Sequence, residues 1–189
     1  MSTDAQSALR ARQGSGARYD SPLAPHDDLL LARRGTAYFL RMLARLPDAG
    51  LAEPSLRPGW SRRRLIAEVS CSARSLAIGL KSLREPLCPE EADWQPDAQS
   101  AATLPAHALR YFFTHSAKHL DVEWRDLPDG TWERELAVAG QTIPARLSPR
   151  LRAAEIWQAA LDLDAGGRAA DLPAALFTPS NGDVQNGQS

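Results

Sequence analysis

Residues 61–84, SRRRLIAEVSCSARSLAIGLKSLR, decide the fold class of this chain. At about 100° per residue, its small and apolar positions fall within one narrow arc. These positions are Leu65, Val69, Ser72, Leu76, Leu80 and Leu83. Ser61 is a good N-cap, and residues 47–59 before it hold three prolines and two glycines, which is typical of a loop. The stretch predicts a long amphipathic helix with one buried face.

Three further segments predict helices around this one. The first runs from Asp27 and Asp28, which suit a helix start, to about residue 46. Another spans about 104–125, and the last opens at Ser148-Pro149, an N-cap followed by proline, and continues to about residue 163. Residues 132–145 read as two short strands around Gly140. The sequence therefore predicts a mainly α fold, a four-helix bundle with a small β-hairpin before the last helix.

Composition limits the kinds of partner. We expect a disordered leader over 1–25, one helical domain over 26–177 and a disordered tail over 178–189. The net charge of −1, from 22 basic and 23 acidic side chains, provides no extended positive field for nucleic acid. No apolar stretch has the length of a membrane span or a signal peptide, and the two cysteines form no CxxC motif. These features favour a cytoplasmic protein without a nucleic-acid or membrane partner. For the partners that composition does not decide, we expect a small-molecule substrate and a monomer or homodimer.

Two glutamates are the candidate catalytic groups. Glu68 lies about 60° from the centre of its helix's apolar arc, at the rim of the core, where a carboxylate needs a partner or a solvated cleft. Its plainer interpretation is a helix-flank side chain that reaches water. Glu155 lies in a helix that is apolar nearly all round, which predicts partial burial. The plainer interpretation of Glu155 is an ion pair with Arg152 or with a neighbouring helix.

The other polar residues of the sequence are weaker candidates for a functional site. His115 and His119 have the i, i+4 spacing of metal ligands, but both lie off the apolar arc of their helix, which favours a solvated pair. The arginines at 62–64 favour a solvated helix start over a phosphate site, and Cys71 favours a small core residue over a nucleophile. The absence of a Gly-rich phosphate loop and of a GxSxG motif argues against nucleotide hydrolysis and serine-hydrolase chemistry.

Four stretches carry a resemblance to a known family. They are LRPGWS at 56–61, GQTIPAR at 140–146, EIWQAALDLDAG at 155–166 and DLP at 171–173. In these, and over roughly residues 30–176, the chain resembles the mycothiol-dependent maleylpyruvate isomerase N-terminal domain family of the DinB-like superfamily. The resemblance implies a DinB-like bundle. It also implies a divalent metal, held by a His on the second helix and a Glu-x-x-x-His pair on the last, that activates a low-molecular-weight thiol such as mycothiol.

Carried onto this chain, that metal triad is degenerate. Its positions fall on Glu68, Glu155 and Ala159, so only Glu155 keeps the expected residue. Because alanine has no lone pair to donate, we expect no metal. If a metal is present, its ligands would be Glu68 and Glu155, with His119 as the candidate nitrogen donor. We also expect the chain to lack the additional C-terminal domain of the fuller isomerases, together with the substrate contacts made there.

Three functions are compatible with these residues. The first is a metal-independent small-molecule enzyme, for example of secondary metabolism, that needs no cofactor. In it Glu68 and Glu155 form a buried acid and base pair for isomerisation, cyclisation or elimination. The second is a thiol-dependent isomerase or S-transferase, with a mycothiol-type thiol and a rebuilt divalent-metal site. The third is a non-catalytic bundle that binds a ligand in its cavity.

Overall fold

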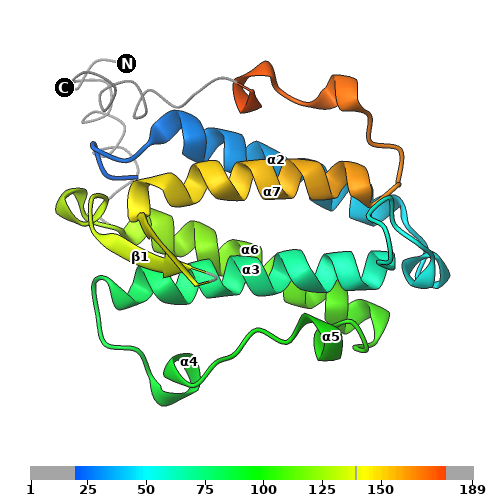
Figure 1. Cartoon of the computed structure of the whole chain (residues 1–189), viewed down its shortest axis with the longest axis horizontal. Helices are drawn as coiled ribbons and strands as arrows, with labels where there is room; N and C mark the ends of the chain where they lie inside the picture. Colours follow the sequence, from blue (N-terminus) through cyan, green and yellow to red (C-terminus); the bar gives the residue numbers. More distant parts are fainter. Residues whose placement is uncertain (1–19, 139, 178–189) are drawn as a thin grey trace, which may run out of the picture.

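The computed structural model describes residues 20–138 and 140–177, and four long helices dominate it (Figure 1). They are α2 (His26–Arg45), α3 (Arg62–Ser82), α6 (Ala106–Asp126) and α7 (Ser148–Asp162). Strands β1 (Glu135–Val138) and β2 (Gln141–Pro144) form an antiparallel hairpin in which Leu136 lies opposite Ile143. The predicted four-helix bundle with a hairpin before the last helix is confirmed, and the helix bounds agree with the periodicity to within a few residues.

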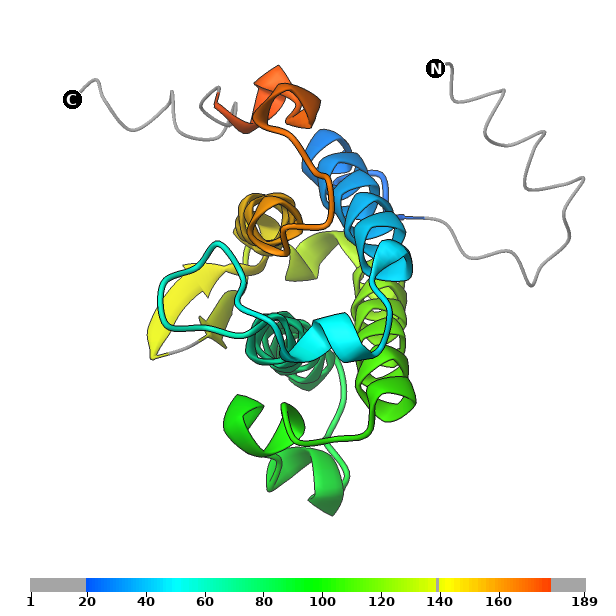
Figure 2. The same cartoon turned by 90° about the vertical axis from the view of Figure 1, so that its right-hand side faces the viewer.

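The helices pair as α2 with α7 and α3 with α6, as the end-on view in Figure 2 shows. Helices α2 and α7 are parallel, because Asp28 meets Arg150 near their starts and Arg45 meets Gly166 near their ends. Helices α3 and α6 are also parallel. Arg63 bonds to the carbonyl oxygen of Leu104 at one end, and Arg84 contacts Glu123 at the other.

The two parallel pairs run in opposite directions. Arg33 near the start of α2 bonds to Asp121 near the end of α6, and Arg110 near the start of α6 bonds to the carbonyl oxygen of Leu43. The bundle order is therefore up, down, down, up. Residues 83–105 must run back along the bundle to connect α3 with α6.

Short helices break up the connections. The crossover holds α4 (Pro89–Ala92) and α5 (Ala98–Ala101), where the prolines predict only a loop. The 3-10 turns are η1 (Ala49–Ala52), η2 (Asp129–Thr131), η3 (Ala145–Leu147), η4 (Ala169–Asp171) and η5 (Ala174–Leu176). The prediction that Ser148 is the N-cap of the last helix is wrong, because η3 runs directly into α7. The buried Ser148 hydroxyl instead donates to the carbonyl oxygen of Ala145 and accepts from Trp124.

The core lies between the four helices, on the faces that the periodicity predicts. Leu65, Val69, Leu76 and Leu80 are buried along α3, whereas Ser72 and Leu83 lie half-buried at the edge of the arc. Phe39 and Phe113 join α2 to α6, with ring centroids 4.6 Å apart. Helices α2 and α7 come very close at Gly35. A Cβ atom there would lie 2.7 Å from Ile156 Cγ2, so this contact requires glycine.

The described part of the predicted leader contacts the bundle. Asp20 forms an ion pair of 2.6 Å with Arg33, and the Ser21 hydroxyl accepts a hydrogen bond of 2.8 Å from the Trp132 indole. Residues 1–19 and 178–189, which include most of the predicted leader and the predicted tail, lie outside the described residues. None of the helices in the described part has both the length and the apolar character to cross a bilayer.

Candidate functional site

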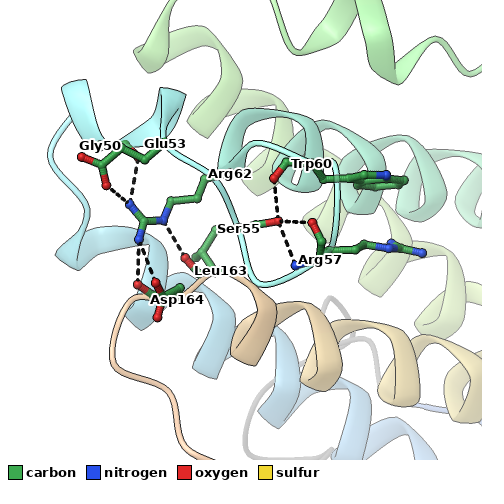
Figure 3. A network of polar contacts seen from close by, with 8 residues as sticks. All are labelled: Gly50, Glu53, Ser55, Arg57, Trp60, Arg62, Leu163 and Asp164. Carbon is green, nitrogen blue, oxygen red and sulfur yellow. Dashed lines mark hydrogen bonds and ion pairs between the residues drawn. The ribbon is translucent and has the colours of Figure 1, made fainter.

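A buried arginine fixes the ends of α3 and α7 to each other. The Arg62 side chain at the start of α3 is only 9% exposed (Figure 3). It donates to the carbonyl oxygens of Gly50, Leu163 and Asp164 at 2.9–3.2 Å, and forms ion pairs with Glu53 at 2.5 Å and with Asp164 at 3.3 Å. The prediction of a solvated helix start is therefore wrong for Arg62, because backbone oxygens distant in sequence satisfy its guanidinium.

The turn before α3 is built around Trp60. The Ser55 hydroxyl donates to the Trp60 carbonyl oxygen over 3.0 Å, and Gly59 adopts a φ of +76°, which favours glycine (Figure 3). The guanidinium of Arg57 lies 4.0 Å from the centroid of the Trp60 ring. Ser61 then caps α3 by accepting a hydrogen bond from the Arg64 backbone N–H, as predicted. The result is a rigid entry into the helix that carries Glu68.

Glu155 is anchored to α3 across the helix interface. Its Oε2 accepts a hydrogen bond of 2.8 Å from the Ser72 hydroxyl and another of 2.8 Å from Arg152 Nη1. The Arg152 side chain is 1% exposed, and the same Nη1 donates to the Val69 carbonyl oxygen over 2.9 Å. The expected Arg152 ion pair is therefore present, and together with Ser72 it holds the Glu155 carboxylate in one orientation.

Glu68 lies one turn before Ser72 on α3, so Ser72 places both glutamates on the same α3–α7 face. Glu68 Oε2 lies 3.3 Å from Arg64 Nη2, which makes an ion pair. The side chain is 39% exposed, yet Oε2 itself is enclosed and accepts no hydrogen bond from the described residues. Each glutamate thus pairs with an arginine of its own helix, and Glu68 keeps one oxygen without a hydrogen-bond donor.

Cys71 lies three residues after Glu68 on α3 and is buried, as predicted for a core residue. Burial raises the pKa of the Cys71 thiol, and the nearby Glu68 carboxylate raises it further. Both effects keep the sulfur protonated at neutral pH, which argues against a nucleophilic role.

The residues on this face do not fit the metal site of the family. Ala159, at the third position of the triad, is buried on α7 one turn after Glu155 and has no donor atom. Within residues 20–138 and 140–177, no three His, Cys, Asp or Glu side chains are grouped so that they could hold a metal ion. The arginines already bound to Glu68 and Glu155 add two positive charges beside them, which oppose a divalent cation.

The histidines of α6 lie elsewhere. His119 Nε2 is 3.4 Å from Oε1 of the buried Glu123, whose other oxygen is 2.5 Å from Arg84. Arg84 follows the end of α3, roughly 20 Å further along that helix than Glu68. The structure therefore separates His119 from the two candidate carboxylates. His115 is exposed and stacks on Tyr111, with centroids 5.7 Å apart, in agreement with the solvated interpretation.

Two residues of this face, Ser72 and Arg152, were not identified as site residues from the sequence. Helical spacing assigns Ser72 to the buried arc of α3, and it indicates Arg152 only as a neutralising partner of Glu155. Ser72 could have been found from two features of the sequence. It lies four residues after Glu68, on the same side of the helix, and a hydroxyl at the edge of an apolar arc needs a hydrogen-bond partner. For Arg152 the signal is its place beside the apolar residues of α7, where a buried charge needs polar partners such as Glu155 and the Val69 carbonyl oxygen.

Fold and site together define a class of protein, a DinB-like four-helix bundle with a polar face between its second and last long helices. Residues 32–164 match the family model described as "Mycothiol maleylpyruvate isomerase N-terminal domain", and the chain belongs to this family. Two crystal structures are similar to it, those of the mycothiol-dependent maleylpyruvate isomerase and of a histidine-to-alanine mutant of that enzyme. Each is 33% identical, and the match covers 82% of this chain and 67% of the other. The TM-scores are 0.72 and 0.73. A comparison with curated proteins found no match.

Proposed function

We propose that this chain is an isomerase-like enzyme that transfers a proton on a small molecule at the α3–α7 face. Glu68 would move the proton and Glu155 would act as a fixed negative charge. The observation that carries the proposal is the contrast between the two carboxylates. Glu155 is held by Ser72 and Arg152, whereas Glu68 keeps an enclosed oxygen without a hydrogen-bond donor. The similarity to a mycothiol-dependent maleylpyruvate isomerase supports the same class of reaction.

Glu68 has the properties of a general base. The Glu68 side chain is 39% exposed, so a substrate C–H or O–H group can approach its carboxylate from solvent, while the enclosed Oε2 receives no hydrogen bond from the described residues and lies 3.3 Å from Arg64 Nη2. Its partner Arg64 is 34% exposed, so the ion pair is partly solvated and easy to rearrange when Glu68 takes up a proton. Base-catalysed isomerisation, cyclisation and elimination begin with the transfer of a substrate proton to such a base.

Glu155 suits a role that does not change its charge. The buried Arg152 pairs with the Glu155 carboxylate over 2.8 Å, and the Ser72 hydroxyl donates to the same oxygen. The other oxygen remains available to accept a hydrogen bond from a substrate hydroxyl and so to orient the substrate beside Glu68. Arg152 is therefore a positioning residue in this mechanism.

The proposed reaction uses no metal, because the donor set at Glu68, Glu155 and Ala159 does not suit one. The alternative with a thiol is supported by the relative, whose name states that it depends on mycothiol. A low-molecular-weight thiol would then be a co-substrate beside the same carboxylates, and it would supply a nucleophilic sulfur. The two alternatives differ in one measurable property, which is the dependence of turnover on added thiol.

The test is the isomerisation of maleylpyruvate by purified protein, with and without mycothiol and with and without a metal chelator. We expect turnover that survives the chelator. Replacing Glu68→Gln should lower kcat by about a hundredfold or more, the range of a lost general base, with little change in KM. Glu155→Gln should also reduce kcat, while Glu133→Gln, which changes an exposed residue between η2 and β1, serves as a charge-matched control. Full activity in both site variants, or no turnover under any of these conditions, would contradict the proposal.

A further inference from the structure

A basic hollow lies on the opposite side of α7 from the glutamates. It is formed by α2 and by the chain that follows α7, and its volume is about 610 Å³. We call it the α2 groove and define it by Arg34, Arg41, Arg45, Trp157, Arg168 and Asp171, with Tyr38 between the arginines of α2. Its volume falls within the range of small-molecule sites in proteins.

The charge of the groove is strongly one-sided. Arg34, Arg41 and Arg45 are seven and four residues apart, so they form one stripe along α2. The groove contains one carboxylate, that of Asp171, against four guanidinium groups. Asp171 is already engaged with Arg168 at 3.1 Å and with the Tyr38 hydroxyl at 2.6 Å. The three arginines of the stripe therefore repel one another without compensation from within the groove.

Several arginines elsewhere in the described residues have carboxylate partners. Arg33 binds Asp20 and Asp121, Arg110 binds Asp48 and Arg146 binds Glu133. Within residues 20–138 and 140–177, by contrast, Arg34, Arg41 and Arg45 form no ion pair. Arg41 lies over the Tyr38 ring at 5.4 Å from its centroid, and Arg45 donates a hydrogen bond to the Met42 sulfur over 3.8 Å. Because the whole chain carries a net charge of −1, the cluster is a local feature and not a result of general basicity.

The floor of the groove is rigid. Tyr38 and Trp157 are buried and stack with ring centroids 4.9 Å apart, and the Trp157 indole donates to the Leu31 carbonyl oxygen over 3.0 Å. The bond from Tyr38 to Asp171 fixes the chain after α7 as the opposite wall. A ligand would thus meet preorganised walls, with only the exposed arginine side chains left to order.

We infer that the α2 groove binds a small molecule that carries two or more negative charges on phosphoryl or carboxylate groups. Guanidinium groups suit such ligands because their paired N–H donors match two oxygens of one anionic group. A ligand with one anionic group offers too few acceptor oxygens to bind arginines on successive turns of α2. A diphosphate or a polycarboxylate can reach more than one of these turns. The site is separate from the carboxylate face, so it goes beyond the proposed function.

The test is calorimetric titration of the full chain with inorganic pyrophosphate and, separately, with citrate. We expect saturable binding of at least one of them, and weaker binding as the salt concentration rises. The variant Arg41→Gln/Arg45→Gln should lose about tenfold or more in affinity. The control Arg57→Gln/Arg146→Gln, which removes the same charge elsewhere, should bind like the unmodified chain. The tighter of the two ligands identifies whether the natural group is phosphoryl or carboxylate.

A second readout locates the binding. The Trp157 indole N–H signal in an NMR spectrum, assigned with Trp157→Phe, should shift on addition of the tighter ligand, while that of Trp60 should not. Since Arg41 and Arg45 are exposed, their variants should keep the melting temperature of the parent. The inference is overturned if neither anion binds, if both double variants bind equally well, or if the Trp157 signal does not respond. Full isomerase activity in Glu68→Gln and Glu155→Gln together with anion binding by the unmodified chain would contradict the proposed function and leave this inference intact, so the two proposals fail independently.

Discussion

Arg62 Nε, at the start of α3, donates a hydrogen bond of 2.9 Å to the carbonyl oxygen of Leu163, the residue that follows α7. This bond closes the end of the bundle where the turn before α3 and the last turn of α7 meet. Three carbonyl oxygens depend on the same guanidinium, so its loss affects more than one pair of residues.

Replacing Arg62→Met should therefore destabilise the protein by about 3 kcal/mol, because buried carbonyl oxygens lose their donor. The measurement is the urea midpoint of unfolding. Arg57→Met removes an exposed arginine from the neighbouring turn and should cost about 0.5 kcal/mol, the size of an exposed cation–π contact. Equal effects of the two changes would contradict the central role of Arg62.

Gly35→Ala should cost about 1–3 kcal/mol, because the new methyl group would overlap Ile156 and Trp157 between two long helices. Gly130→Ala is the matched control, since a Cβ atom added at that position would have no other atom within 4 Å and its φ is ordinary. Gly79→Ala should fall between them, since its Cβ would meet the end of the Leu136 side chain, which can turn aside. Thermal unfolding of the three variants checks this order.

Glu123 should make the bundle sensitive to acid. Burial raises the pKa of this carboxyl, but hydrogen bonds from His119 and Arg84 outweigh it and hold the pKa below its ordinary value of 4.5. The stabilisation is therefore complete above pH 4.5 and is lost as the pH falls through the lower pKa of the folded state.

We expect Glu123→Gln to cost about 2 kcal/mol at pH 7, and the difference from the parent to shrink as the pH is lowered below 4.5. Unfolding midpoints in urea at several pH values provide the measurement. A difference that stays constant down to about pH 3 would show that the charge of Glu123 does not contribute. The change Glu133→Gln, in an exposed ion pair, should have little effect at either extreme.

The family triad should be recoverable by substitution. In Glu68→His/Ala159→His, two imidazoles would join Glu155 at the positions implied by the resemblance, and we expect about one divalent ion to be bound per chain. The single variant Glu68→His lacks the third donor and should bind far less. Equal uptake by the single and double variants, measured by metal analysis after dialysis, would show that this face is not the equivalent site.

Much of the fold was predictable because helical periodicity is a local property. The faces of α3 and α6 follow from spacing alone, and the hairpin follows from turn residues around Gly140. The direction of the helices was not predictable, since a 3.6-residue period is the same for parallel and antiparallel neighbours. The crossover through α4 and α5 appears only when the end of α3 is seen beside the end of α6.

The site was predictable in part. Glu68 and Glu155 could be proposed from their places in apolar helices and from the family resemblance, and the structure shows Ser72, one turn after Glu68, bonded to Glu155. Their roles remain a prediction. The burial of Arg62 could not be predicted, because its acceptors are mostly backbone carbonyl groups, one in the preceding loop and two about 100 residues away. Every residue type has a backbone carbonyl group, so the sequence does not indicate which of these groups accept a hydrogen bond from a side chain.

The pairing of α2 with α7 also has a consequence for biosynthesis. Of the four long helices in the described residues, the first to leave the ribosome packs mainly against the last, so the apolar stripe containing Leu31 and Gly35 stays uncovered until α7 has been made. Until Ile156 and Trp157 emerge, the nascent chain exposes this stripe. Ribosome-bound chains halted before α7 should therefore be more sensitive to protease and to chaperone capture than chains halted after Asp171.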